Sequence, residues 1–470
     1  MKGIEEKFHD ECGVIGVYAP GKKDIARGVY FGLHSLQHRG QESAGIAVNR
    51  QGTIQYHKDM GLVQEVFNDE IIERLQGDIA IGHVRYSTAG ESHAGNAMPL
   101  VIYLRDKAVA LAHNGNLVNA RILKQKMQNK GVIFQTEIDS EVIAALIARY
   151  GRDVPIEEAI EKALKKIQGA YALVITTGNK LIGVRDPNGL RPLCIGKNED
   201  GYILSSESCV FPLLGAKLVR DVEPGELVVI ENGALTSYPY ARKEKLASCA
   251  FEYVYFARPD SRIDGIGVYT ARSKCGKILA RECPVPADMV ISVPDSGTVA
   301  AIGYAEESGI PYGEGLIKNR YIGRTFIQPD QRMRELSVKL KLNVLAENIA
   351  GKRLIMVDDS IVRGTTSGKI VKMLKDAGAR EVHIRVASPP VTDPCFFGID
   401  TPDKEKLAAA KYTIEEICKM TGADSLGYLS VEGMLRAIGL GKDRICTACF
   451  TGEYPMELPE QNRKERKEHG

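Results

Sequence analysis

The chain has 470 residues, of which 44% are hydrophobic and 26% charged, the proportions of a globular protein rather than a disordered or fibrous one, and this length predicts two large domains. Lysine and arginine (62) nearly balance aspartate and glutamate (60), so the net charge of +2 provides no global field for binding nucleic acid or an anionic membrane. No apolar run approaches the roughly eighteen residues of a membrane span, and the polar N-terminus is unlike a secretory signal, so we expect a cytoplasmic protein.

The first half of the chain is rich in short predicted strands. Apolar runs broken by Gly, Asn and Asp predict them at 14–18, 44–48, 79–84, 108–112, 171–176, 180–184, 202–205 and 226–230. Helical spacing is found at about 117–128, 140–150 and 156–167. Together these patterns predict antiparallel sheet with helices packed outside it.

From about residue 265 the pattern changes to alternating helices and strands. Apolar strand candidates lie at 288–293, 353–357 and 382–387, and this alternation predicts a doubly wound parallel sheet. We place the boundary between the two halves at about 240–250, near the charged stretch ARKEK (241–245). The charged end NRKERKEHG (462–470) is expected to be solvated.

The segment LIMVDDSIVRGTTSGKI (354–370) is the most specific motif of the second half. An apolar strand ends in Asp358 and Asp359, and a turn of small residues then leads into a helix. Such a helix start presents free N–H groups that suit a phosphate, and carboxylates at the end of a parallel strand suit ribose hydroxyls or Mg²⁺. The alternative is that both aspartates only cap the helix, which explains the following RGTTS less well.

Cys12 begins the apolar strand CGVIGVY, a position at which a cysteine is more often a buried core residue. However, HRGQESAGIA (38–47), HVRYST (83–88), LAHNGNLVN (111–119) and TEIDSEVI (136–143) follow in order. These segments resemble the glutamine amidotransferases with an N-terminal nucleophile. The resemblance implies an Ntn-hydrolase-type antiparallel sandwich (αββα) over 12–245 and a propeptide over 1–11, whose removal frees the α-amino group of Cys12. That amine has a suitable pKa to activate a thiol, which is weakly ionised near neutral pH.

The same resemblance assigns roles to individual residues. Asn114 and the Gly115 N–H would hold the oxyanion, although Asn-Gly is also a common hairpin turn. Arg85 would bind the α-carboxylate of glutamine and Asp139 its α-ammonium group. With the α-amine as base, His83 and His113 are expected to be structural.

The segment 354–370 resembles the type I phosphoribosyltransferases, which implies such a domain over 246–455 followed by a polar tail over 456–470. By itself SVPDSG (292–297) is a weak signal, because Pro-Asp-Ser-Gly is common in turns. The family resemblance implies that this segment is the pyrophosphate loop. The basic stretch 317–343 would close over the diphosphate, or is simply a solvated loop. The implied sugar-phosphate ligands are Asp295, Ser296, Asp358, Asp359, Ser360, Arg363, Gly364, Thr365, Thr366 and Ser367, with Mg²⁺ at Ser296, Asp358 and Asp359.

Both halves in one chain resemble the glutamine-dependent phosphoribosyl pyrophosphate amidotransferases over about 12–455, and FEYVYFARPDS (251–261) also matches. The implied reaction converts phosphoribosyl pyrophosphate, glutamine and water to 5-phosphoribosylamine, glutamate and pyrophosphate, the first committed step of purine synthesis, with ammonia passed internally. The family is inhibited by purine nucleotides and forms homo-oligomers, with a tetramer implied here. Candidate phosphate contacts for the inhibitor are Lys318, Arg320 and Lys339.

Two other functions are considered. A glucosamine-6-phosphate synthase would share the first half but lack VDDSIVRGTTS (357–367). A non-catalytic regulator that binds phosphoribosyl pyrophosphate would have no use for Cys12, Arg85, Asn114-Gly115 and Asp139 together.

The chain contains ten cysteines, two of which, Cys446 and Cys449, form a C-x₂-C pair. By itself this pair is equally consistent with zinc, a redox pair or chance. One branch of the family carries a [4Fe-4S] cluster on four cysteines, and the resemblance places it at Cys249, Cys395, Cys446 and Cys449. Apart from Cys12, the other cysteines are expected to be core residues.

Overall fold

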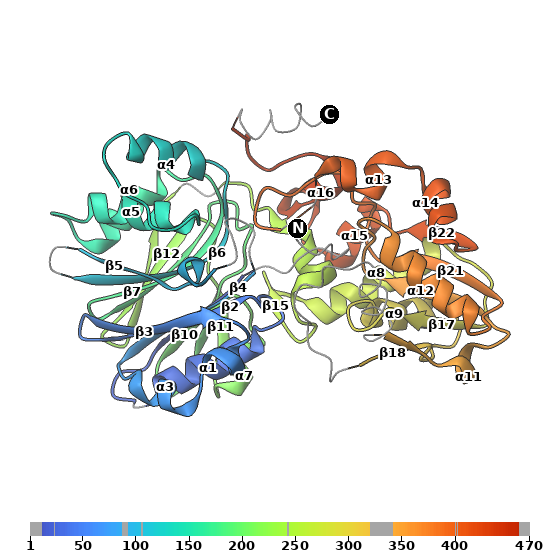
Figure 1. Cartoon of the computed structure of the whole chain (residues 1–470), viewed down its shortest axis with the longest axis horizontal. Coiled ribbons are helices and arrows are strands. Elements are labelled where there is room, and N and C mark those ends of the chain that lie inside the picture. The colour runs from blue at the N-terminus through green and yellow to red at the C-terminus, as the bar shows by residue number, and fades with distance from the viewer. Residues whose placement is uncertain are drawn as a thin grey trace.

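A computed structural model describes residues 12–22, 24–86, 93–104, 107–241, 244–319, 342–399, 401 and 403–459. In Figure 1 the first half of the chain forms a stack of sheets flanked by helices, and the second half forms a separate helix-covered sheet beside it. The predicted propeptide (1–11), most of the basic stretch (320–341) and the end of the tail (460–470) lie outside the described residues. Among the described helices, none combines the length and hydropathy needed to cross a bilayer.

An antiparallel sheet contains the strand that follows Cys12. Its strands are β1 (Gly13–Tyr18), β2 (Ser43–Arg50), β3 (Thr53–Met60), β4 (Ile79–Arg85), β9 (Cys194–Lys197), β10 (Tyr202–Ser205) and β11 (Lys217–Asp221), in the order β11-β9-β10-β1-β4-β2-β3. The helices packed on its outer face are α1 (Ile25–Ser35), α2 (Val63–Val66), α3 (Asp69–Arg74) and α7 (Val210–Leu213).

A second antiparallel sheet stacks on the first. Its strands are β5 (Leu100–Tyr103), β6 (Ala108–Leu117), β7 (Gly169–Thr177), β8 (Lys180–Arg185), β12 (Glu226–Glu231) and β13 (Ala234–Pro239), in the order β13-β12-β8-β7-β6-β5. A short 3₁₀ turn, η1 (Ala94–Asn96), precedes β5. The outer face is covered by α4 (Ala120–Gln128), α5 (Ser140–Tyr150) and α6 (Ile156–Leu164).

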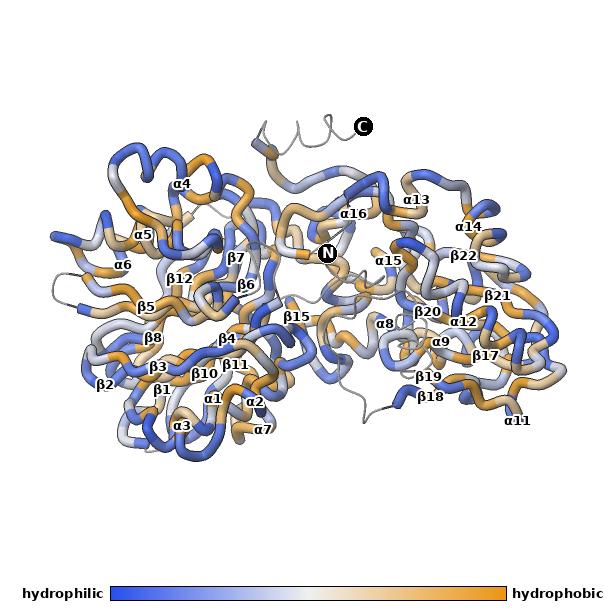
Figure 2. Tube along the Cα trace, viewed as in Figure 1, coloured by the Kyte–Doolittle hydropathy of each residue, from blue (hydrophilic) through white to orange (hydrophobic). Residues whose placement is uncertain are grey.

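The two-residue period of the strands explains the layers. Val14 packs between the sheets whereas its neighbour Ile15 packs under α1, because successive side chains of a strand point to opposite faces. Both faces of each sheet are therefore apolar, and hydrophobic segments run along the central strands in Figure 2 while α4 is largely hydrophilic. The layers helix, sheet, sheet, helix confirm the predicted αββα sandwich.

The second half is built on a parallel sheet. Its strands are β17 (Met289–Ser292), β20 (Arg353–Asp358), β21 (Glu381–Val386) and β22 (Ser425–Tyr428), in the order β17-β20-β21-β22. The surrounding helices are α8 (Val268–Glu282), α9 (Thr298–Ser308), α12 (Thr365–Asp376), α14 (Ile414–Thr421) and α15 (Val431–Ile438). Ile355 packs towards α8 and α9 whereas Leu354 packs towards α12. Helices cover both faces, which confirms the doubly wound fold.

Short elements connect these layers. The π-helical turn η2 (Glu252–Phe256) lies between the halves, and the parallel pair β14 (Ser248–Cys249) and β23 (Ile445–Cys446) joins this connection to the C-terminal region. The remaining short elements are β15 (Arg262–Ile263), β16 (Ile266–Gly267), β18 (Leu316–Lys318), β19 (Leu342–Val344), α11 (Ala346–Ile349), η3 (Lys404–Lys406), α13 (Ala408–Lys411), η4 (Lys442–Arg444) and α16 (Ala448–Thr451).

The structure corrects some local predictions. The helix expected from about residue 117 begins at Ala120, because β6 continues through Leu117, and the helix expected to reach 167 ends at Leu164. Edge strands β3 and β13 were not predicted, because their mostly exposed residues lack an apolar run. The domain limits 12–245, 246–455 and 456–470 stay predictions.

Candidate functional site

Cys12 lies directly before β1, the central strand of the first sheet. Gly13 pairs with Val84 of β4, so Cys12 lies next to the end of β4, where Arg85 is found. Its buried thiol donates a long hydrogen bond to the carbonyl of Tyr86, with the sulfur 3.7 Å from the oxygen. Burial raises the pKa of the Cys12 thiol to about 11, Arg85 lowers it and Asp139 raises it. The thiol is therefore neutral at neutral pH and needs a base before it can attack a carbonyl.

Arg39 was not given a role by the sequence, although HRGQESAGIA (38–47) contains it. Its Nε donates a hydrogen bond of 3.1 Å to the carbonyl of Cys12. The fully buried guanidinium also forms ion pairs of 2.6 Å with Glu207 and with Glu252 of η2. Arg39 thus fixes the backbone of Cys12 to the connection between the halves.

The predicted oxyanion residues lie inside β6. Asn114 pairs with Ala172 and Gly115 with Tyr171 of β7, so the hairpin alternative for Asn-Gly is wrong. Gly115 has a φ of +140°, and a Cβ there would lie only 2.1 Å from the carbonyl oxygen of Ala170, which explains the glycine. Within the described residues, the buried Asn114 Nδ2 has no hydrogen-bond partner. A buried unpaired donor is costly, so a ligand oxygen is the partner it suits.

Buried histidines connect the two sheets next to this strand. His83 Nε2 donates to the carbonyl of His113 over 2.9 Å, and His113 Nδ1 lies 2.9 Å from the Ser140 hydroxyl. Burial lowers the pKa of His83 to about 3 and also lowers that of His113, so both rings are neutral. Their place in the packing agrees with the structural role expected of them.

Asp139 lies at the start of α5 and contacts the end of β6. One of its carboxylate oxygens accepts a hydrogen bond of 2.8 Å from the Leu117 N–H. Its negative charge raises the pKa of the Cys12 thiol. The structure thus places Arg85 at the end of β4 next to Cys12 and Asp139 against the end of β6, whereas the roles of these residues toward glutamine stay predictions.

The acidic pair of the second half lies at the carboxyl end of β20. Asp358 and Asp359 are both 1% exposed. Ser296, from the loop after the neighbouring strand β17, donates a hydrogen bond to Asp359, and Ser360 donates another of 2.6 Å. Parallel pairing of β17 and β20 thus brings the two predicted loops together. Asp295 forms an ion pair of 2.7 Å with Lys318, a predicted nucleotide contact, while Arg320 and Lys339 lie outside the described residues.

The small-residue turn after Arg363 forms the start of α12. Gly364 is the N-cap residue with a φ of +83°, and Thr365, Thr366 and Ser367 form the first turn. The alternative in which the aspartates cap this helix is therefore wrong. Because Gly364 has no side chain, no capping side chain covers this helix start, which suits a phosphate.

Comparison with known proteins finds relatives that match nearly the full length of the chain. Residues 83–212 match the family model described as a glutamine amidotransferase domain. An amidophosphoribosyltransferase of Archaeoglobus fulgidus is 53% identical, covering 95% of this chain and 98% of that protein. One of Bacillus subtilis is 50% identical, covering 97% and 96%. The solved glutamine phosphoribosylpyrophosphate amidotransferase of B. subtilis in complex with ADP and GMP is 49% identical, with a TM-score of 0.90 and coverage of 96% and 98%.

The chain belongs to the amidophosphoribosyltransferase family.

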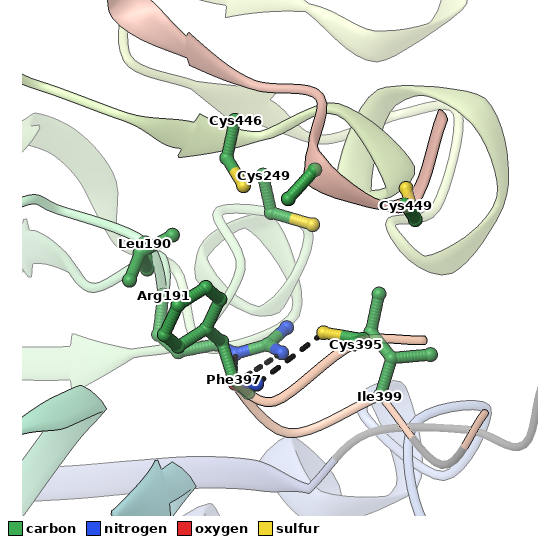
Figure 3. A pocket seen from close by; sticks show the side chains of 9 residues that line it. Leu190, Arg191, Cys249, Cys395, Phe397, Ile399, Cys446 and Cys449 are labelled. Atoms are coloured by element: carbon green, nitrogen blue, oxygen red, sulfur yellow. Dashed lines mark hydrogen bonds between the residues drawn. The ribbon is translucent and has the colours of Figure 1, made fainter. Parts of the chain in front are cut away.

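In this amidophosphoribosyltransferase the four predicted cluster cysteines line one cavity, shown in Figure 3. Cys249 and Cys446 are paired across β14 and β23, Cys449 lies in α16, and Cys395 lies in the loop after β21. Leu190, Arg191, Phe397, Ile399 and Ala448 complete the lining. The pairing of segments nearly 200 residues apart is what brings the C-x₂-C pair to Cys249.

The lining of this cavity offers four cysteine thiols, which are the donor type that an iron–sulfur cluster takes. Burial raises the pKa of Cys446 to about 12 and raises those of Cys249 and Cys449 further, so the thiols stay protonated unless a metal compensates their charge. Among the described residues, no three Cys, His, Asp or Glu side chains surround a point suited to a single metal ion. The free volume is about 10 Å³, so a cluster would have to displace the sulfur atoms from their present positions.

Proposed function

We propose that this chain transfers the amide nitrogen of glutamine to C1 of phosphoribosyl pyrophosphate, giving 5-phosphoribosylamine, glutamate and pyrophosphate, the first step of purine synthesis. The observation that carries this proposal is that the chain is about 50% identical to amidophosphoribosyltransferases over nearly its full length and holds the residues of both sites. The first half has the buried Cys12 and a buried Asn114 amide with no partner among the described residues, and the second half has an acidic pair at the end of a parallel strand.

The first site would release ammonia. After removal of residues 1–11, the freed amine of Cys12 takes the thiol proton and the sulfur attacks the glutamine amide carbon. Asn114 Nδ2 and the Gly115 N–H donate to the resulting oxyanion, while Arg85 and Asp139 hold the α-carboxylate and α-ammonium. The Cys12 ammonium then gives the proton taken from the thiol to the amide nitrogen, so that collapse expels ammonia and leaves a thioester. Water hydrolyses the thioester to glutamate and the free thiol. Each oxyanion donor is expected to contribute about 2.7–4 kcal/mol to transition-state stabilisation.

The second site would use the ammonia, which we propose passes internally. Its nitrogen attacks C1 of the sugar as the bond to pyrophosphate breaks, and the product amine then loses a proton. The N–H groups at Gly364–Ser367 suit the 5-phosphate, and the acidic pair suits the ribose hydroxyls. Ser296, Asp358 and Asp359 would hold Mg²⁺, which neutralises charge on the leaving pyrophosphate.

The decisive assay is pyrophosphate release from phosphoribosyl pyrophosphate. We expect release that depends on glutamine or on free ammonia, with one glutamate formed per pyrophosphate in the glutamine reaction. Glucosamine-6-phosphate formation from fructose 6-phosphate should be undetectable. Purified enzyme that hydrolyses glutamine yet releases no pyrophosphate from either nitrogen source would contradict the proposed reaction.

We also propose a [4Fe-4S] cluster at Cys249, Cys395, Cys446 and Cys449, which the common lining of one cavity supports. A purine nucleotide at Lys318, Arg320 and Lys339 and assembly into a homo-oligomer are proposed from the family resemblance.

Protein purified without oxygen is expected to be brown and to contain about four iron and four sulfide per chain. Cys395→Ser should lower the iron content, because it removes one thiolate ligand. Cys418→Ser is the matched control, since that thiol contacts the Ala423 carbonyl at 3.4 Å and does not line the cavity. Colourless protein with stoichiometric zinc would refute the cluster.

A further inference from the structure

We propose that the segment Phe396–Gly398 of the second half, through Asn116, positions the oxyanion strand β6 of the first half. Asn116 is thereby a positioning residue for glutamine hydrolysis. The inference rests on the proposed function of Asn114 and Gly115.

Direct contacts join the two segments across 280 residues of sequence. Asn116 Nδ2 donates a hydrogen bond of 2.9 Å to the carbonyl of Phe396. Gly398 lies against the backbone of Gly115, since a Cβ built on Gly398 would lie 3.2 Å from both the Cα and the carbonyl carbon of Gly115. The segment therefore contacts β6 at Gly115 and at the residue that follows it.

The segment itself is firmly anchored. Arg191 donates two hydrogen bonds, of 2.9 and 2.6 Å, to the carbonyl of Phe397, and these bonds are drawn in Figure 3. Phe397 is buried in one hydrophobic cluster with Val118, which directly follows β6, and Ala170 of β7. Tyr454 packs edge-on against both phenylalanine rings, and its hydroxyl donates to the Pro394 carbonyl over 2.6 Å. A displacement of β6 would have to break several of these contacts at once.

This anchoring matters because, among the described strands, the end of β6 is paired on one side only, by β7, whereas β5 pairs with β6 only as far as Leu111. Gly115 adopts a φ of +140°, which few residues favour. The orientation of the backbone at Gly115 decides where the Gly115 N–H points. Oxyanion donors act on charge that develops in the transition state, so a small displacement weakens the transition state more than glutamine binding. Loss of the Asn116 bond should accordingly lower kcat and leave KM for glutamine unchanged.

The test compares Asn116→Ala with Asn119→Ala. Asn119 makes a matched amide-to-carbonyl bond of 2.9 Å, to Lys166, but within the first half. We expect Asn116→Ala to lower kcat with glutamine about tenfold, with unchanged KM and unchanged ammonia-dependent activity. Asn116→Asp keeps the shape of the side chain but cannot donate the hydrogen bond, so it should lower kcat as much as Asn116→Ala. Asn119→Ala should keep kcat even where it lowers Tm.

An aldehyde analogue of glutamine provides a readout independent of turnover. The Cys12 thiol adds across its carbonyl, forming a carbon–sulfur bond and placing the former carbonyl oxygen in the oxyanion position. The inhibition constant of the aldehyde should rise in Asn116→Ala by the same factor by which kcat falls. Gly398→Ala, which forces a side chain towards Gly115 and Arg191, should show the same selective loss.

Two outcomes would overturn the inference. The first is that Asn116→Ala leaves both kcat with glutamine and the affinity for the aldehyde unchanged. The second is that Asn116→Ala lowers ammonia-dependent activity as much as glutamine-dependent activity, which indicates general disruption of the protein. Failure of the proposed function itself is recognised separately, because Cys12→Ala would then retain glutamine-dependent activity.

Discussion

Replacing Cys12 by alanine is expected to lower glutamine-dependent synthesis on the order of 10³-fold or more while leaving ammonia-dependent synthesis intact. The thiol is the only group proposed to attack the amide, and the sugar-phosphate residues lie in the other half of the chain. Both rates are measured as pyrophosphate release. Intact mass should show that the wild-type protein has lost residues 1–11.

Cys194→Ala is the matched control for this variant. Cys194 is a buried thiol of the same sheet and also donates to a backbone carbonyl, that of Ser205, with the sulfur 3.2 Å from the oxygen. It should keep both activities and lose residues 1–11 normally. If Cys12→Ala loses ammonia-dependent synthesis without unfolding, the proposed division of labour is wrong. Wild-type protein that retains its leader and still hydrolyses glutamine at full rate would exclude activation by the terminal amine.

Replacing Asp359 by asparagine is expected to lower synthesis from both nitrogen sources on the order of 100-fold. The substitution keeps the size of the side chain but removes a buried negative charge that accepts bonds from Ser296 and Ser360. Binding of phosphoribosyl pyrophosphate with Mg²⁺, measured by calorimetry, should weaken in parallel. Labelling of Cys12 by a thiol-reactive glutamine analogue should continue, because the first site is intact.

Asp288→Asn is the matched control, because it tests whether removing another carboxylate next to this sheet also lowers synthesis. Asp288 lies before β17, at the opposite end of the parallel strands, where it forms an ion pair of 2.8 Å with Arg353. Arg353 lowers the pKa of Asp288 to about 2, but the pair is exposed, so its loss should leave both activities unchanged. Full ammonia-dependent activity in Asp359→Asn would remove this residue from the sugar-phosphate site.

Local sequence was sufficient for most elements and for the order of the motifs. Short apolar runs predicted central strands such as β1 and β6, because a strand buried on both faces has apolar residues at successive positions. The strand, acidic pair and small-residue turn around Asp358 are contiguous, so the helix start and the carboxylates could be placed without distant contacts. Edge strand β3 could not be predicted this way, since exposed residues need no apolar pattern.

Tertiary structure decided which distant residues meet. Asn-Gly at 114–115 is a turn signal by itself, but pairing with β7 keeps both residues in a strand. Arg39 reaches Glu252, and Asn116 reaches Phe396, only because the halves pack together. The sequence by itself determined the two folds and the types of residue each site offers, because those depend on neighbours along the chain. The contacts that join the halves depend on packing between segments far apart, which no local pattern records.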